Sequence, residues 1–294
     1  MSLDNLKCPI CNSKNIKLEY KDENTERLEV GYAKSGNISE LYICNSCYVR
    51  FTDFLKDFDK KIYESQNDEL YKKSEYARKL TFNKDFNNIL KNFDNIEGNI
   101  LDVGCGPGYF LDIAKKKGYQ ADGIELSKAD CSEANSKGFN VYCTDFISFC
   151  EHNKGKSYGL ITMFDFIEHV NNPKEIISNC YEILNNNGNL VISTPNIGSL
   201  FAKIMGKKWW CFIPMHLFYF NKKSIKYLLE QKGFKILKIK IHTRYINFGN
   251  SIEWLRRYGI IYKLVKGITN ILHLGKLNFK VTFFDDMIIY ATKK

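Results

Sequence analysis

The stretch Leu101-Asp102-Val103-Gly104-Cys105-Gly106-Pro107-Gly108 decides the fold. The short apolar run Ile100–Val103 enters it, and Tyr109–Lys117 follows with the composition of a helix. Glycines let a ligand approach the backbone where any Cβ would clash, and the first turn of a helix offers unpaired N–H groups. This stretch therefore predicts a strand, a turn that binds a nucleotide-derived ligand, and a helix. The three glycines lie closer together than in the dinucleotide fingerprint, which argues against NAD.

Downstream of this turn, short apolar runs alternate with helix-length segments as far as about Lys240. Such alternation indicates βαβ units and a parallel sheet that is covered on both faces. Lys222–Lys232 is expected to be a helix that ends at Gly233. The strands are expected at Ile100–Val103, Gln120–Glu125, Val141–Thr144, Leu160–Met163, Leu190–Ser193, Phe234–His242 and Val281–Thr292. We predict an α/β fold with a doubly wound, mostly parallel, seven-stranded sheet.

Carboxylates follow the second and third of these strands. Glu125 ends the second strand, where a carboxylate is placed to accept both hydroxyls of a ribose. Asp145 and Phe146 follow the third strand. The carboxylate of Asp145 could accept a hydrogen bond from an adenine amino group while the ring of Phe146 covers the base. The two strand ends therefore favour an adenosyl ligand.

Taken together, these motifs resemble the class I S-adenosylmethionine-dependent methyltransferases. The matching segments are 101–108, Glu125, Asp145, Tyr158–Val170 and Gly188–Asn196, and the resemblance covers about 99–242. It implies a Rossmann-like methyltransferase fold with S-adenosylmethionine as cofactor, and a ring at Phe164 that borders the sulfonium. The cofactor-binding residues that it implies are Asp102, Gly104, Cys105, Gly106, Gly108, Tyr109, Glu125, Leu126, Asp145, Phe146 and Phe164.

Within that family the chain is similar to the ubiquinone-type small-molecule methyltransferases, because Pro214-Met-His216-Leu-Phe-Tyr-Phe220 matches their Pro-x-His-x-x-x-Phe segment. Methyl transfer needs an aligned acceptor and a group that removes its proton, and a base is most effective when its pKa is near neutral, which favours histidine. His216 is our first candidate for this base and His169 the second. His169 could instead organise its loop through Glu168, and either histidine could be a packed core residue.

Four of the ten cysteines form two CxxC pairs, Cys8 with Cys11 and Cys44 with Cys47. Four thiolates in two such pairs suit a structural zinc ion with a closed tetrahedral shell. We therefore expect a zinc-ribbon-like module at the N-terminus, similar to those of some sugar-modifying methyltransferases. We interpret the remaining six cysteines as small apolar fillers: Cys105, Cys131, Cys143, Cys150, Cys180 and Cys211.

We expect three parts along the 294 residues. They are a zinc-binding module at 1–52, a helical lead-in at 53–98, and the methyltransferase domain at 99–294 with lid or insert segments at 199–221 and 250–278. The chain carries a net charge of +10, and residues 201–294 hold 19 Lys and Arg against four Asp and Glu. Such asymmetry points to an anionic partner. The absence of an apolar leader or a long apolar run makes the cytoplasm the expected location.

The leading functional hypothesis is transfer of a methyl group to a hydroxyl or amine of a small, anionic or phosphate-bearing acceptor, such as a nucleotide-linked or lipid-linked sugar. The alternative is an RNA or protein methyltransferase that docks through the zinc module and the basic C-terminal third; nucleic acid is the less favoured partner. A scaffold that retains the fold without activity is a third reading. The segment 251–274 spaces apolar residues on one helical stripe, which suits a packed helix, a lid, or peripheral contact with a membrane.

Overall fold

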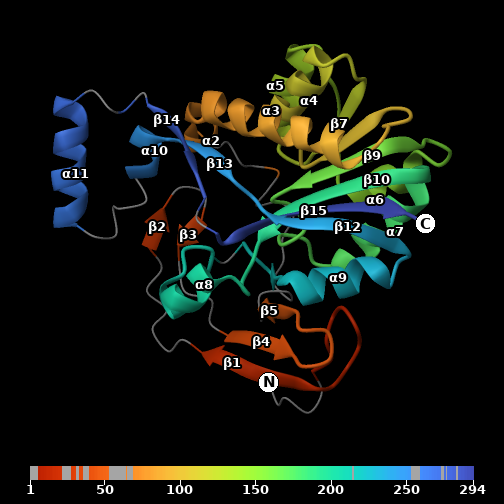
Figure 1. Ribbon diagram of the computed structural model, residues 1–294, viewed down its shortest axis with the longest axis horizontal. Coiled ribbons are helices and arrows are strands. Elements are labelled where there is room, and N and C mark those ends of the chain that lie inside the picture. The colour runs from red at the N-terminus through yellow and green to blue at the C-terminus, as the bar shows by residue number, and fades with distance from the viewer. Residues whose placement is uncertain are drawn as a thin grey trace.

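The computed structural model describes residues 6–21, 28–30, 33–35, 40–52, 64, 69–213, 215–252, 259–272, 275, 277–282 and 284–294. Its centre is a seven-stranded sheet with the order β12-β15-β10-β9-β6-β7-β8 (Figure 1). The parallel strands in the middle and at one edge are β6 (Ile100–Val103), β7 (Ala121–Glu125), β8 (Asn140–Cys143), β9 (Tyr158–Phe164) and β10 (Leu184–Pro195). At the other edge β15 (Asp286–Lys293) runs antiparallel to β10 and to β12 (Phe234–Ile241). This confirms the mostly parallel sheet.

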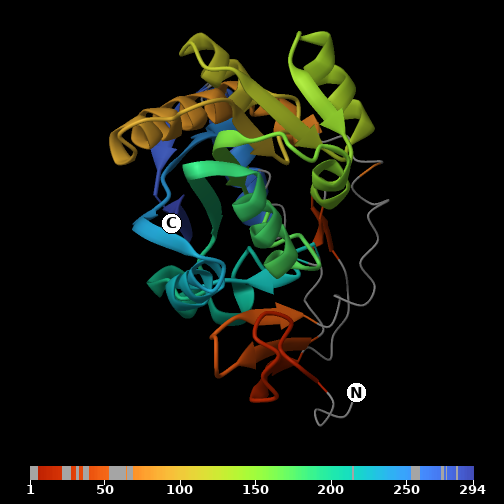
Figure 2. The same cartoon turned by 90° about the vertical axis from the view of Figure 1, so that its right-hand side faces the viewer.

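Helices cover both faces of the sheet (Figures 1 and 2). Successive side chains of a strand point to opposite faces, so each strand feeds two cores. Ile100 and Leu160 join one core, while Leu101 and Ile161 join the other. One face carries α2 (Glu69–Lys73), α3 (Glu75–Asn92), α4 (Tyr109–Lys116) and α5 (Lys128–Ser136); the other carries α6 (Phe146–His152), α7 (Pro173–Ile183) and α9 (Lys222–Glu230). The doubly wound fold is confirmed.

Most of the predicted elements appear within a few residues of their expected bounds. The predicted helix at Lys222–Lys232 is α9, and Gly233 follows it with φ +92°. The predicted strand Val281–Thr292 was wrong at its start. Val281 ends a separate strand, β14 (Asn278–Val281), and Phe284 has a left-handed φ of +62° that interrupts the extended chain before β15 begins.

The N-terminal module shares its sheet with a distant part of the chain. Its strands β1 (Ile16–Lys21), β4 (Glu40–Cys44) and β5 (Arg50–Thr52) are antiparallel, and β11 (Phe218–Tyr219) pairs with β5 as a fourth strand. A separate hairpin joins β2 (Leu28–Val30) to β3 (Ala33–Ser35). The segment before β11 holds the helix α8 (Leu200–Met205) and a short 3-10 turn at Gly206–Lys208. The module therefore packs onto the larger sheet and is no detached satellite.

An antiparallel ribbon projects between β12 and β15. It consists of β13 (Arg244–Asn247) and β14, and it carries α10 (Phe248–Ile252) and α11 (Ile260–Ile271) between its strands. The sequence predicted one helix over Ser251–Leu274. The structure has two helices there, and residues 253–258 and 273–274 lie outside the described part of the chain.

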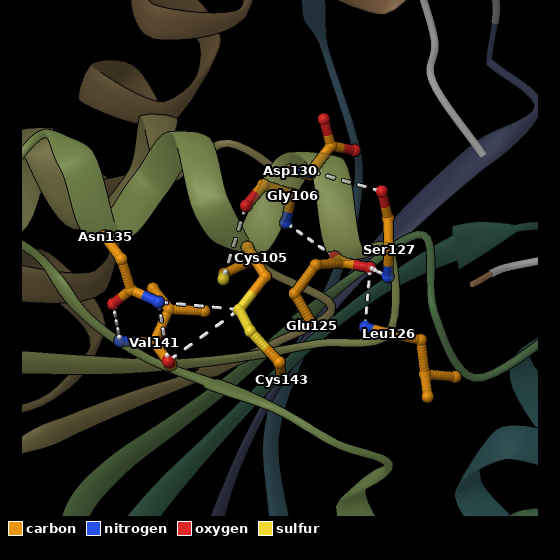
Figure 3. The surroundings of a disulfide bond; sticks show 10 residues. Cys105, Gly106, Glu125, Leu126, Ser127, Asp130, Asn135, Val141 and Cys143 are labelled. Carbon is orange, nitrogen blue, oxygen red and sulfur yellow. Dashed lines mark hydrogen bonds between the residues drawn. A yellow bond between two sulfur atoms is a disulfide. The ribbon is translucent and has the colours of Figure 1, made fainter. Parts of the chain in front are cut away.

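A disulfide bond joins Cys131 of α5 to Cys143 at the end of β8 (Figure 3). The Cα atoms lie 5.8 Å apart, within the usual range for a disulfide. The interpretation of these two cysteines as apolar fillers was wrong, because α5 packs directly onto β8 and brings their side chains together. The other four scattered cysteines, Cys105, Cys150, Cys180 and Cys211, are free thiols that are buried or half-buried.

Candidate active site

The glycine turn follows β6 at the carboxyl edge of the parallel strands. Gly106 and Gly108 have φ values of +52° and +82°, in the left-handed region that glycine adopts at little cost. A Cβ on Gly108 would lie 2.8 Å from the ring of Phe139, so the turn is tightly packed there. A Cβ on Gly106 would find its three nearest atoms on Tyr71, the closest 3.6 Å away. Gly106 therefore faces Tyr71 across a space that a side chain would fill, as close approach of a ligand to the backbone requires.

Glu125 holds this turn in place. Its carboxylate accepts hydrogen bonds of 2.8 Å from the backbone N–H groups of Gly106, Leu126 and Ser127 (Figure 3). Burial raises the pKa of Glu125 above its ordinary value, and the three N–H donors oppose that shift. A carboxylate has about four acceptor sites, so Glu125 can accept further hydrogen bonds from the hydroxyls of a ribose while it keeps the turn closed.

Asp102 and Cys105 lie beneath the turn. Both are almost fully buried, and Thr162 of β9 donates a hydrogen bond of 2.6 Å to the Asp102 carboxyl. Burial raises the pKa of Asp102 to about 7, although the Thr162 hydroxyl lowers it. The thiol of Cys105 occupies the space over Gly123, where a Cβ would lie 2.5 Å from its sulfur. These two residues support the turn from below, and the prediction that they bind the cofactor stays a prediction.

Asp145 caps the helix that follows β8. Its carboxylate accepts hydrogen bonds from the backbone N–H and the hydroxyl of Ser148, at 3.0 and 2.9 Å. Asp145 can serve an adenine amino group only with its remaining acceptor capacity. The expectation that the ring of Phe146 covers the base is not supported, because Phe146 is the first residue of α6 and its ring is buried in the core beneath the sheet.

Two residues that sequence reasoning missed lie over the glycine turn. Tyr71 of α2 faces Gly106 and stacks on the buried ring of Tyr109, with 5.7 Å between ring centroids. The guanidinium carbon of Arg78 lies 3.6 Å from the centroid of the Tyr71 ring, and its Nε is buried with no hydrogen-bond partner in the described part of the chain. An unused cationic donor beside the turn suits the carboxylate of an amino acid. No local sequence motif marks these positions, which precede the turn by some thirty residues.

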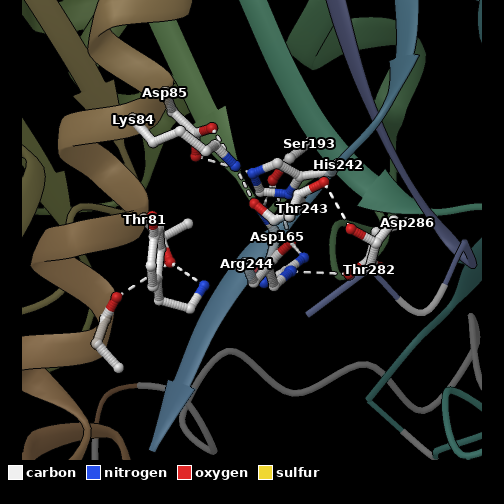
Figure 4. Close-up of polar contacts among 12 residues, drawn as sticks. Thr81, Lys84, Asp85, Asp165, Ser193, His242, Thr243, Arg244, Thr282 and Asp286 are labelled. Carbon is white, nitrogen blue, oxygen red and sulfur yellow. Dashed lines mark hydrogen bonds and ion pairs between the residues drawn. The ribbon is translucent and has the colours of Figure 1, made fainter. Parts of the chain in front are cut away.

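The residues after β9 form a polar cluster at the same edge (Figure 4). Arg244 of β13 donates hydrogen bonds of 2.6 Å to Asp165 and 2.7 Å to Asp286. Burial opposes ionisation of Asp165, but the guanidinium of Arg244 lowers its pKa below the ordinary value. Phe164 packs with its ring centroid 5.1 Å from Phe82 and 5.0 Å from a second core ring, that of Phe110. The prediction that Phe164 also borders the sulfonium stays a prediction.

The structure brings the two candidate bases together, with 4.7 Å between the ring centroids of His169 and His216. The Nδ1 atom of His169 donates to the backbone oxygen of Met215 at 3.0 Å, and that of His216 to the backbone oxygen of Cys211 at 2.8 Å. Because a carbonyl can only accept, each ring carries its proton on Nδ1 and Nε2 is the acceptor. Burial lowers the pKa of His169 to about 4; burial and the neighbouring ring lower the pKa of His216 to about 3. Both rings are therefore neutral at pH 7, below the near-neutral pKa that we expected.

Glu168 completes this pair. Its side chain is 1% exposed, and one carboxyl oxygen accepts a hydrogen bond of 3.0 Å from Thr194. The other oxygen is buried without a hydrogen-bond partner in the described part of the chain. Burial, together with the charge of Asp165, raises the pKa of Glu168 well above its ordinary value. Ligand atoms of Glu168, His169 and His216 all lie within 4.8 Å of one another. Such a group can take up a proton, and its donors are also of the kind that hold divalent transition metals.

The N-terminal module positions the segment that contains His216. The backbone N–H of Thr52 in β5 donates to the oxygen of Leu217 at 3.1 Å, and Phe218 pairs with Phe51 in register. The backbone N–H groups of Leu217 and Phe218 donate in turn to the oxygen of Glu168. A continuous set of hydrogen bonds therefore joins the module, His216 and the end of β9.

The four cysteines of the two CxxC pairs also converge. The sulfur atoms of Cys8 and Cys47 lie 3.5 Å apart, as do those of Cys11 and Cys44, and all four lie within 4.8 Å of one another. A tetrahedral zinc site with Zn–S bonds of about 2.3 Å requires sulfur atoms about 3.8 Å apart. A hydrogen bond from Cys47 lowers the pKa of Cys8 to about 5, toward the thiolate that a metal needs. The four residues therefore fit a structural zinc ion.

Comparison with known proteins agrees with this geometry. The sequence model of the methyltransferase domain family matches residues 71–239, more than half of the chain. The ubiquinone biosynthesis O-methyltransferase of Nitrosococcus oceani is 30% identical over 113 residues, which cover 36% of this chain and 48% of that protein. The enzyme of the same name from Pasteurella multocida is 29% identical over 111 residues, 33% of this chain and 46% of that protein. The chain spans about half the length of these curated relatives.

Solved structures share the fold. A SAM-dependent methyltransferase from Archaeoglobus fulgidus has a TM-score of 0.51 at 22% identity and covers 74% of this chain and 97% of its own. The magnesium protoporphyrin IX methyltransferase of Synechocystis has a TM-score of 0.50 at 15% identity, over 82% of this chain and 97% of its own. None of the described helices is both long and apolar enough to cross a bilayer.

Proposed function

Since this chain belongs to the methyltransferase domain family of class I, S-adenosylmethionine-dependent enzymes, we propose that it transfers a methyl group from S-adenosylmethionine to a hydroxyl or amine of a small molecule. One observation carries the proposal. The glycine turn is held open by Glu125 at the carboxyl edge of the parallel strands, and the unused guanidinium donor of Arg78 lies above it. Ligands of open α/β sheets bind at this edge.

The binding residues fall into two groups. Glu125 accepts the ribose hydroxyls beside its three backbone hydrogen bonds, and the first turn of α4 offers N–H groups. Arg78 pairs with the carboxylate of the methionine end, while the Tyr71 ring closes over Gly106 and excludes water. The fit depends on Gly106, because any side chain there would fill the space that the ligand needs.

The chemistry of the step is modest for the protein. S-adenosylmethionine supplies a methyl group that its positively charged sulfur already activates. The chain aligns the acceptor, and holding two reactants in a fixed geometry is worth up to roughly 7–11 kcal/mol in the best cases. The Nε2 atom of His216, unprotonated because Nδ1 binds Cys211, accepts the hydrogen bond and then the proton of the acceptor group. His169 and Glu168 pack beside it and fix its orientation.

The acceptor that we propose is anionic or phosphate-bearing, for example a nucleotide-linked or lipid-linked sugar. Two observations support this class. The C-terminal third carries 19 cationic against four acidic residues, and the curated relatives are named as O-methyltransferases of a small-molecule pathway. The zinc ion that we propose for the four cysteines is structural, because four thiolates leave no open coordination position for catalysis.

A labelled-methyl assay tests the function. Purified chain is incubated with labelled S-adenosylmethionine and fractionated cell metabolites, with cellular RNA and protein as separate arms. We expect label in a small-molecule fraction, and label only in RNA or protein would overturn the proposed acceptor class.

His216→Ala is the matching variant. It should bind S-adenosylhomocysteine as the parent does while its turnover falls by about 10²- to 10⁴-fold, the usual contribution of a general base. His152→Ala is the control, because His152 makes the same kind of Nδ1 contact with a backbone oxygen, that of Ser148, but lies on the surface at the end of α6. Equal loss in both variants, or loss of ligand binding in His216→Ala, would remove His216 as the base.

A further inference from the structure

The helix α11 presents an unpartnered apolar face. It stands at the outer end of the β13–β14 ribbon, away from the central sheet (Figure 1). Ile260, Leu264, Ile268 and Ile271 are 77, 63, 55 and 77% exposed. Their spacing of four, four and three residues places them on one stripe of a helix. A packed helix or a lid closed over the sheet would bury such a stripe, so the structure does not support these two readings of the segment.

The charge around this stripe has one sign. The sequence from 254 to 284 contains six lysine and arginine residues and no aspartate or glutamate. Lys263 on α11 is exposed beside the apolar stripe. An exposed apolar stripe flanked by cations is the pattern of a helix that lies in the interface of an anionic bilayer.

The length of α11 fits an interfacial position. Its 12 residues make about 18 Å of helix at 1.5 Å per residue, well short of the roughly 30 Å hydrocarbon core. A second copy of this chain is a poor occupant, because two such stripes facing each other would bring two basic segments together. An anionic lipid surface offers both apolar depth and the opposite charge.

The ribbon is fastened to the active site at its base. Arg244 at the start of β13 binds Asp165, the residue that follows β9 (Figure 4). The backbone N–H of Tyr245 donates to Thr81 of α3 at 2.8 Å, and Asn250 of α10 donates to Ser74 at the same distance. These contacts couple the orientation of the ribbon to the edge of the sheet where the glycine turn lies.

We propose that α11 docks this chain on an anionic membrane surface through Ile260, Leu264, Ile268 and Ile271. Docking of this kind brings the carboxyl edge of the sheet near the lipid surface, where an acceptor anchored in the membrane is reached; that consequence rests on the proposed function. The docking itself does not depend on it.

Vesicle flotation tests the proposal with the full chain. Vesicles of phosphatidylglycerol and phosphatidylcholine in equal parts are compared with phosphatidylcholine alone, at low and high salt. We expect retention on the anionic vesicles only, and weaker retention at high salt because salt screens charge. Leu264→Glu should lower the partition coefficient at least about tenfold. Leu90→Glu is the control, because Leu90 is an exposed leucine of α3 (41%) and its replacement should leave partitioning unchanged.

Three outcomes would overturn the proposal. They are no retention of the parent chain on anionic vesicles, equal retention of parent and Leu264→Glu, and a dimer in lipid-free sedimentation that Leu264→Glu dissolves. Calorimetry with S-adenosylhomocysteine on the same preparations separates the two ideas. Vesicle binding without ligand binding supports the docking and refutes the proposed function, and ligand binding without vesicle binding does the reverse.

Discussion

Gly106→Ala separates the two demands that the glycine turn places on its backbone. Alanine at φ +52° costs roughly 1–2 kcal/mol of folding free energy, because an L-residue is strained in the left-handed region. The new Cβ would lie 3.6 Å from Tyr71, an ordinary contact, so we expect no further loss of stability. The same methyl group fills the space between Gly106 and Tyr71 where the ligand lies. Overpacking of this kind costs about 1–3 kcal/mol, which raises the Kd for S-adenosylhomocysteine by about 5- to 150-fold.

Gly118→Ala supplies the matched control. Gly118 follows α4 with φ +83°, and a Cβ there would have no atom within 4 Å. It should lose the same roughly 1–2 kcal/mol of unfolding free energy with no change in ligand affinity. Urea unfolding and calorimetric titration of both variants provide the two numbers. If Gly106→Ala bound S-adenosylhomocysteine as the parent does, or if both variants lost affinity equally, the turn would not be the binding site.

Three further predictions follow from the site. Arg78→Met should weaken S-adenosylhomocysteine about 10- to 100-fold, the worth of a charge-assisted hydrogen bond, and leave methylthioadenosine, which lacks the carboxylate, unchanged; equal weakening of both ligands would contradict the role of Arg78. Burial lowers the pKa values of His169 and His216 to about 4 and 3, so the unfolded chain binds more protons below pH 6.5 and stability falls as the pH drops from 7 to 5. His216→Asn should flatten that fall by about 2 kcal/mol in pH-dependent unfolding, and an unchanged slope would show that the ring is not buried neutral. Cys47→Ser should lose the one zinc per chain found by metal analysis, and it should lower turnover more than ligand affinity because β5 holds the segment of His216; undiminished turnover without zinc would contradict that coupling.

Local patterns were enough to predict the sheet and its turn. The run Leu101–Gly108 determines its own conformation, because a buried strand, glycines in left-handed conformations and a following helix are all encoded within a few residues. Glu125 was found for a related reason, since its place at the end of the next strand follows from the periodicity. The hydrogen bonds that it makes to Gly106, Leu126 and Ser127 were not foreseen, because they depend on how the turn folds back over β7.

The parts that sequence reasoning missed are contacts between distant segments. Tyr71 and Arg78 carry no motif, and only the packing of α2 and α3 brings them over the turn. The pairing of β5 with β11 joins strands more than 160 residues apart, and its register shows only in three dimensions. The low pKa values of the two histidines follow from burial, which composition alone does not reveal.

The most direct test of the central claim is a crystal structure of this chain with S-adenosylhomocysteine. We predict both ribose hydroxyls within hydrogen-bond distance, about 2.5–3.0 Å, of the Glu125 carboxylate, with the amino acid end between Gly106 and Tyr71. A ligand bound elsewhere, or a ribose that does not contact Glu125, would contradict the account.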